Sequence, residues 1–89
     1  METRAINLSR LVSGEVRAEL ARQELTQEDL ARKLGRSQNY GSMRLRGEAS
    51  FTLDDLGGAC DLFGLDPDVL LRRALASETR TVERVERTE

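Results

Sequence analysis

The chain is divided by signals that start and stop short helices. Each start signal is a residue that can cap a helix, followed by a carboxylate three residues later or directly by proline. The start signals are Thr26 with Asp29, Thr52 with Asp55, and Asp66 with Pro67. A glycine follows each of three apolar turns, in the position where a left-handed residue commonly ends a helix. These glycines are Gly35, Gly47 and Gly64. These start and stop signals predict a set of short helices.

Apolar residues recur at helical spacing between these signals and upstream of them. The expected helices span about 8–23, 27–34, 38–46, 53–63 and 67–75. Gly14 can soften or interrupt the first of them. Strand signals are weak, and only 3% of the residues are aromatic, which favours a core of Leu, Val and Ala. The predicted fold is all-α, a five-helix domain over residues 1–76 followed by a short tail over residues 77–89.

Cysteine and histidine usage excludes several functions. The chain has one cysteine, Cys60, and no histidine, so a disulfide framework, a usual zinc site and a Ser/His or Cys/His triad are excluded. We expect Cys60 to be a small core residue, and we expect no enzymatic activity, metal, cofactor or small-molecule ligand. The longest stretch without a charged side chain is Ser37–Met43. It is too short for a membrane span or signal peptide, which predicts a cytoplasmic protein.

Charge is segregated along the chain. Residues 30–47 hold five basic side chains and no acidic one, whereas residues 48–71 hold six acidic side chains and no basic one. A charge run is usually a solvated face, but a sharp change of sign between neighbouring segments favours a directed field. We interpret residues 30–47 as the part that approaches a polyanion. The acidic segment would then repel that polyanion from the wrong face.

Residues 27–46 have the spacing of a helix-turn-helix. Two short helices meet across Gly35, Arg36 and Ser37, and Ser37 can cap the second helix. So short a turn crosses the helices steeply. The second helix is then held out from the body, where it can enter the major groove of DNA.

Side chains on helix 38–46 suit base readout. Gln38 and Asn39 lie in its first turn, and a carboxamide can donate and accept together at the N6/N7 edge of adenine. Ser42 lies one turn further on the same face. Met43 can contact a thymine methyl group, and Arg46 can reach guanine or phosphate. These five residues are the predicted base-reading set.

Phosphate contacts are expected around the second helix. The amide end of helix 27–34 suits a phosphate oxygen, and nearby cations can neutralise further phosphates. The predicted phosphate-binding residues are Thr26, Gln27, Arg32, Lys33, Arg36 and Arg44.

The stretch LTQEDLARKLGRSQNYGSMRLRGEASFTLDDLGGACDLFGLDPDVLL resembles the lambda-repressor/Cro-like, XRE-type helix-turn-helix family. The matching elements are Thr26-Gln27, Leu30-Ala31, Leu34-Gly35, Ser37-Gln38, Gly47, Leu56 and LFGLDPDVLL, within roughly residues 12–75. The variant SQ-x-Y…RLRGE…F-x-x-DDL is similar to regulators of actinobacteria and their phages, in agreement with thirteen arginines against one lysine. The resemblance implies a five-helix domain that binds operator DNA, usually as a dimer.

Helix 38–46 departs from the family pattern on its inner face. Gly41 and Arg44 stand where apolar side chains normally point inward. A glycine inside a helix costs about 0.5–1 kcal/mol relative to alanine. Two arrangements can fill the gap. Either Met43 and Leu45 pack inward on a slightly rotated helix, or Tyr40 folds back over the gap.

Three functions are compatible with these features. The first is a sequence-specific transcriptional regulator, of the phage or prophage repressor or Cro-like kind, bound to a double-stranded DNA operator. The second is an antitoxin-type regulator that also binds a toxin through its tail. The third is a protein-binding adaptor, which the net charge of −2 supports because DNA-binding domains are often basic overall.

The tail carries the expected pairing surface. Leu71 and Leu75 lie four residues apart on the last helix, and Val82 and Val85 follow in the tail. The tail itself can be a frayed helix, a pairing strand or disordered. Four apolar residues make a weak interface, so we expect a homodimer that forms in full only on DNA.

Overall fold

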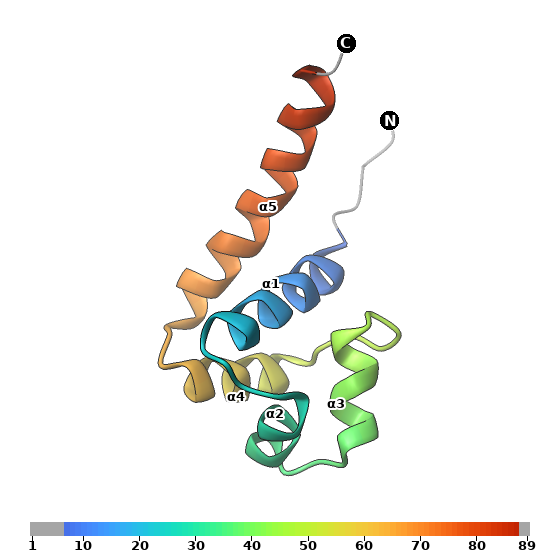
Figure 1. The fold of residues 1–89 in the computed structure, drawn as a ribbon, viewed down its shortest axis with the longest axis vertical. Helices are drawn as coiled ribbons and strands as arrows, with labels where there is room; N and C mark the ends of the chain where they lie inside the picture. The colour runs from blue at the N-terminus through green and yellow to red at the C-terminus, as the bar shows by residue number, and fades with distance from the viewer. Residues whose placement is uncertain (1–6, 88–89) are drawn as a thin grey trace.

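The computed structural model describes the backbone of residues 7–87 and the side chains of residues 7–77. Over this range the chain forms five α-helices and no strand, which confirms the predicted fold class. The helices are α1 Leu8–Arg22, α2 Gln27–Leu34, α3 Gln38–Leu45, α4 Leu53–Phe63 and α5 Pro67–Arg87 (Figure 1). None of the helices in the described part is long and apolar enough to cross a membrane.

The predicted helix ends are confirmed at most positions. The Thr26 hydroxyl accepts the Asp29 amide at 3.1 Å, and the Asp29 carboxylate accepts the Thr26 amide at 2.8 Å. Thr52 and Asp55 form the same reciprocal pair. The three glycines expected after helices adopt left-handed φ angles of 69°, 79° and 73° at Gly35, Gly47 and Gly64. At Asp66 it is the backbone carbonyl that accepts amides of the first turn of α5.

The apolar core joins all five helices, with Leu45 as the contribution of α3. Val16, Leu30, Leu70, Ala59 and Ala74 are fully buried in it. Cys60 is 2% exposed, and burial raises the pKa of its thiol, as expected for a small core residue. Helix α1 runs through Gly14 without interruption and packs mainly against α5. In Figure 1, α1 lies between α5 and the group formed by α2, α3 and α4.

A polar cluster fixes the base of α5 to α1. Glu19 of α1 is buried, and it pairs with Arg22 and with Arg73 of α5, whose Nη1 lies 3.2 Å from the carboxylate. Burial acts to raise the pKa of Glu19, but hydrogen bonds from Gln23 and Arg22 outweigh it and hold that pKa below its usual value. Gln23 also donates to the Phe63 carbonyl at 3.1 Å. Of these contacts, the Glu19–Arg73 pair joins α5 to α1, and the Gln23–Phe63 hydrogen bond joins the end of α1 to the end of α4.

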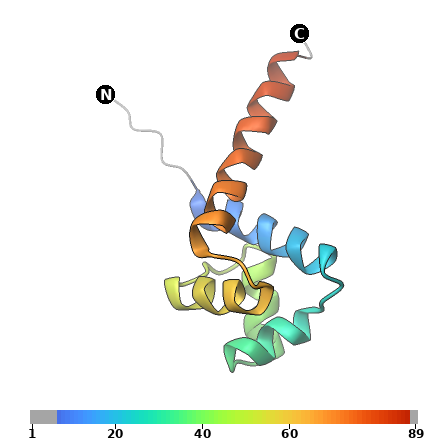
Figure 2. The same ribbon diagram turned by 90° about the vertical axis from the view of Figure 1, so that its left-hand side faces the viewer.

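The predicted end of the last helix near residue 75 is wrong, because α5 continues to Arg87. No glycine or proline follows Pro67, so nothing in the backbone stops the helix at the expected place. The helix therefore crosses the expected domain boundary between residues 76 and 77. Figures 1 and 2 show its C-terminal half extending away from the other four helices. The side chains of Val82 and Val85, assigned to the pairing surface, lie outside the described residues.

Candidate nucleic-acid interface

Helices α2 and α3 form the expected helix-turn-helix. Gly35 ends α2 in a left-handed conformation, and Ser37 starts α3 by accepting the Tyr40 amide on its hydroxyl at 3.1 Å. The two helices approach closely at Gly41, which is buried, and where a Cβ atom would lie 3.6 Å from that of Ala31. Helix α3 is left at the edge of the domain (Figure 1).

The inner face of α3 has a feature of each predicted arrangement. Leu45 packs inward, and Tyr40 turns toward α4, but Met43 is not part of the core. Leu45 is 2% exposed and belongs to the core, whereas the Tyr40 hydroxyl donates to both carboxylate oxygens of Asp55 at 2.9 and 3.0 Å. The Arg44 guanidinium lies 3.5 Å from the centre of the Tyr40 ring, and its Nε lies 3.5 Å from the carboxylate. Arg44 therefore fills the inner gap with a cation that Asp55 balances.

Asp55 holds α3 and α4 together. Its side chain is buried, and it serves as the N3 residue of the α4 capping box as well as the acceptor for Tyr40. Burial acts to raise the pKa of Asp55, but the Thr52 backbone hydrogen bond, the Tyr40 hydrogen bond and the Arg44 charge together hold it below its usual value. The group is therefore ionised at neutral pH.

Helix α1 holds the C-terminal end of α3, which the sequence did not predict. The buried Ser13 hydroxyl donates to the Arg44 carbonyl at 2.7 Å, and the Arg17 guanidinium donates to the Leu45 carbonyl. Both acceptors belong to the last turn of α3, whose carbonyls have no partner within the helix. The one sequence signal for this contact is Ser13 itself, a polar residue on the apolar face of α1.

The five predicted base-reading residues lie along α3 and its C-terminal cap. Gln38 and Asn39 are exposed, Ser42 and Met43 are half-buried, and Arg46 is exposed. The Asn39 amide donates to the Met43 sulfur at 3.6 Å, and Arg46 donates to the Ser42 hydroxyl. The structure therefore brings these residues together as one polar surface of the outer helix.

Most of the predicted cations pair with carboxylates. The pairs are Arg32 with Asp29, Lys33 with Asp61, Arg44 with Asp55, and Arg46 with Glu48. Arg36 instead lies over the Tyr40 ring at 4.6 Å. The acidic side chains of residues 48–71 are therefore not all directed away from the basic segment, whereas their repulsion of a polyanion stays a prediction. Three of their carboxylates lie against cations of residues 30–47, because the chain turns after Gly47 and α4 packs on α2.

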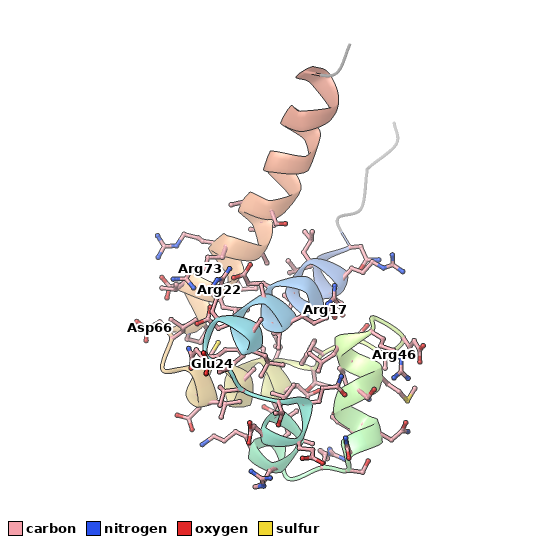
Figure 3. The ribbon with its side chains drawn as sticks, in the orientation of Figure 1. Arg17, Arg22, Glu24, Arg46, Asp66 and Arg73 are labelled. Carbon is pink, nitrogen blue, oxygen red and sulfur yellow. The ribbon has the colours of Figure 1, made fainter. Side chains whose placement is uncertain are left out.

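A cleft of about 670 Å³ lies between α1, the start of α2 and the end of α3. Thr26, Gln27 and Arg46 line it, together with Arg17, which sequence reasoning missed. Figure 3 shows Arg17 and Arg46 on the same side of the molecule. A neighbouring cavity of about 300 Å³ adds Arg10 to the same two arginines. Neither cavity is lined by Arg32, Lys33 or Arg36, so the structure divides the predicted phosphate set between separate surfaces.

A short helix bearing exposed polar side chains, supported by a second helix and flanked by arginines, defines a helix-turn-helix DNA-binding domain. A family model described as a helix-turn-helix domain matches residues 12–75, and the chain belongs to this family. Its fold is similar to the crystal structure of the clp gene regulator ClgR from C. glutamicum, with a TM-score of 0.74 and 23% sequence identity. The match covers 82% of this chain and 95% of that chain. No curated protein matches the sequence.

Proposed function

We propose that the chain is a sequence-specific transcriptional regulator that inserts α3 into the major groove of operator DNA. The observation that carries this proposal is the position of the polar row Gln38, Ser42 and Arg46 beside a cleft lined by Arg17 and the start of α2. A base-reading helix needs exposed donors and acceptors next to groups that fix the phosphate backbone. The outer surface of α3 supplies the first, and the cleft supplies the second.

Base readout falls to the outer residues of α3. Gln38 and Asn39 are exposed in its first turn, where a carboxamide can pair with adenine. Met43 offers its apolar end to a thymine methyl group. Ser42 and Arg46 serve the next bases along the groove, so the readout runs from the start of α3 to its end.

Phosphate binding is assigned first to the cleft. Thr26 and Gln27, at the start of α2, line the same cleft as Arg17 and Arg46, and the amide end of a helix favours an anion. Arg32, Lys33 and Arg36 lie around α2 and the turn and bind flanking phosphates. Arg32 exchanges the half-buried Asp29 for DNA, and Lys33 exchanges the exposed Asp61. We leave Arg44 out of this set because its guanidinium is held between Tyr40 and Asp55.

The more specific functions that the sequence analysis considered stay predictions. They are the phage or prophage repressor role, the antitoxin alternative and the protein-binding adaptor. A homodimer also remains a proposal. Its support is the exposure of Leu75 on α5, at 39%, and the extension of α5 away from the domain.

Selection of bound sequences from a random double-stranded DNA pool tests the proposal. Gln38→Ala should weaken binding to the selected site by about 1–3 kcal/mol and leave unrelated DNA nearly unchanged. Arg36→Ala is the matched comparison, because it should weaken all sequences alike and lower the slope of log K against log salt by about 1. Failure of the wild-type chain to bind any DNA would favour the adaptor function instead.

Removal of residues 77–89 tests the dimer. The truncated chain should keep the helical fold of the domain and bind a two-fold symmetric operator more weakly, because two half-sites would no longer be joined. Full affinity of the truncated chain for a single half-site, at one chain per site, would contradict the proposed dimer.

A further inference from the structure

Arg46, at the C-terminal cap of α3, is held by two neighbours. Its Nε lies 3.1 Å from one carboxylate oxygen of Glu48, and its Nη2 lies 2.9 Å from the other. Its Nη1 donates to the Ser42 hydroxyl one turn back on α3. Both charged side chains remain about half exposed, at 50% for Arg46 and 54% for Glu48. The guanidinium is therefore fixed at the surface and not buried.

The backbone fixes Glu48 in this position. Gly47 has a φ of 79°, and the amide of Glu48 donates to the Met43 carbonyl at 2.9 Å. The Gly47 amide donates to the Arg44 carbonyl at 3.1 Å, which completes a Schellman motif. The left-handed turn brings Glu48 back beside Arg46, although the two residues are only two apart in sequence.

The hydrogen-bond inventory of Arg46 shows what remains available. A guanidinium has five N–H donors in a planar fork. Glu48 takes the Nε hydrogen and one Nη2 hydrogen, and Ser42 takes one Nη1 hydrogen. One hydrogen remains on each Nη atom. Because Glu48 occupies the edge formed by Nε and Nη2, the free Nη2 hydrogen lies on the terminal edge of the guanidinium, which Nη1 shares.

Two parallel donors on one edge match the O6 and N7 acceptors of guanine. We infer that Glu48, assisted by Ser42, positions Arg46 to read a guanine at the end of α3, and that Glu48 thereby sets specificity at that base pair. This inference rests on the proposed function. Glu48 acts as a positioning residue, because its carboxylate contacts Arg46 and not the base.

Charge pairing alone does not account for the arrangement. An exposed ion pair contributes little to stability, whereas a carboxylate beside DNA opposes phosphate binding. A phosphate accepts an arginine from many directions, so a fixed fork adds little to a phosphate contact. A base edge requires the guanidinium to point in one direction, and the bidentate contact with Glu48 holds it in that direction.

Base substitution in the selected site tests the inference with the full chain. Arg46→Ala first identifies the base pair at which sequence preference relaxes. Wild type and Glu48→Gln are then titrated against the selected site and against the same site with that G·C pair changed to A·T. Wild type should prefer guanine about tenfold or more, and Glu48→Gln should retain less than about threefold preference. Asp54→Asn, which removes one charge from the first turn of α4, should behave as wild type.

The possible failures are distinguishable. A wild-type chain that selects no sequence contradicts the proposed function and the guanine contact with it. A selected site without guanine at the Arg46-dependent position overturns the guanine contact alone. A Glu48→Gln variant that binds both sites more tightly by one factor, with its preference intact, shows that Glu48 only repels DNA.

Discussion

Helices α2 and α3 have the same length but are held in the domain by different forces. Helix α2 places Leu30 and Ala31 in the core and begins and ends with a capping box and a left-handed glycine. Helix α3 contributes Leu45 to the core. Its attachments to α4 and α1 also include polar contacts, through Tyr40 and Arg44 to Asp55, and through backbone carbonyls to Ser13 and Arg17.

The difference follows from what each helix presents to DNA. Helix α2 supports its neighbour, so an ordinary apolar stripe is sufficient. Helix α3 keeps its outer side chains polar and its inner face small at Gly41, where α2 approaches. Apolar packing is non-directional, whereas hydrogen bonds at both ends of α3 constrain its position. Polar attachment thus fixes the direction in which the outer residues of α3 point.

Leu30→Ala should have the largest effect on stability, because it removes the apolar attachment of α2. The side chain is fully buried, and its truncation should lower the free energy of unfolding by about 3–4 kcal/mol. Chemical denaturation followed by circular dichroism measures the loss. Leu53→Ala is the control, because Leu53 is 86% exposed and should change stability by less than about 0.5 kcal/mol. Equal losses would contradict the assignment of Leu30 to the core.

Asp55→Asn should have the next largest effect, because it weakens the polar attachment of α3. The amide cannot balance Arg44 or accept on both atoms, and the free energy of unfolding should fall by about 2 kcal/mol at pH 7. Asp54→Asn, a substitution at the exposed neighbouring carboxylate, is the matched control.

The same pair of variants has a defined pH dependence. Burial opposes the shift, but hydrogen bonds from Thr52 and Tyr40 hold the pKa of Asp55 below its usual value in the folded chain. Its stabilisation is therefore present above the unfolded pKa of about 3.9 and is lost as pH falls through the lower folded pKa. The difference between wild type and Asp55→Asn should shrink below about pH 4. A difference that grows on acidification would contradict the role of Asp55.

The sequence predicted the bounds and caps of α2 better than it predicted the contacts that hold α3 in place. The signals for α2 are local, since Thr26, Asp29 and Gly35 act within a few residues of the helix. The contacts that hold α3 to α1 join Ser13 and Arg17 to carbonyls 31 and 28 residues away. No periodicity reveals such a pairing. The same reason explains why Arg17 was missed as a lining residue of the cleft.

Ser13→Ala should have a moderate effect that separates position from stability. Loss of the buried hydrogen bond to the Arg44 carbonyl should cost about 1 kcal/mol. We also expect the affinity for the selected operator to fall more than the affinity for unrelated DNA. The reason is that the Arg44 carbonyl, in the last turn of α3, would lose the hydrogen bond from Ser13 that helps to position the helix. Exposed Ser50→Ala is the control for both measurements. An unchanged operator preference in Ser13→Ala would show that α1 supports only the stability of α3.

Gly41→Ala should have the smallest effect on the free energy of unfolding, and it should stabilise the chain where the other substitutions destabilise it. A Cβ atom at this position would lie 3.6 Å from that of Ala31, an ordinary contact, and Gly41 does not have a positive φ. Alanine should therefore stabilise the chain by about 0.5 kcal/mol through helix propensity alone. Thermal unfolding measures the gain.

Gly58→Ala in α4 sharpens the comparison, because a Cβ atom there would lie 2.6 Å from Leu34 Cδ2. Leu34 must then move, and the displacement should cancel the gain in propensity. A destabilised Gly41→Ala chain beside an unaffected Gly58→Ala chain would show that α2 and α3 tolerate no added methyl group between them. The glycine would then be required by the close approach of the two helices, and the polar attachment of α3 would be a consequence of that approach.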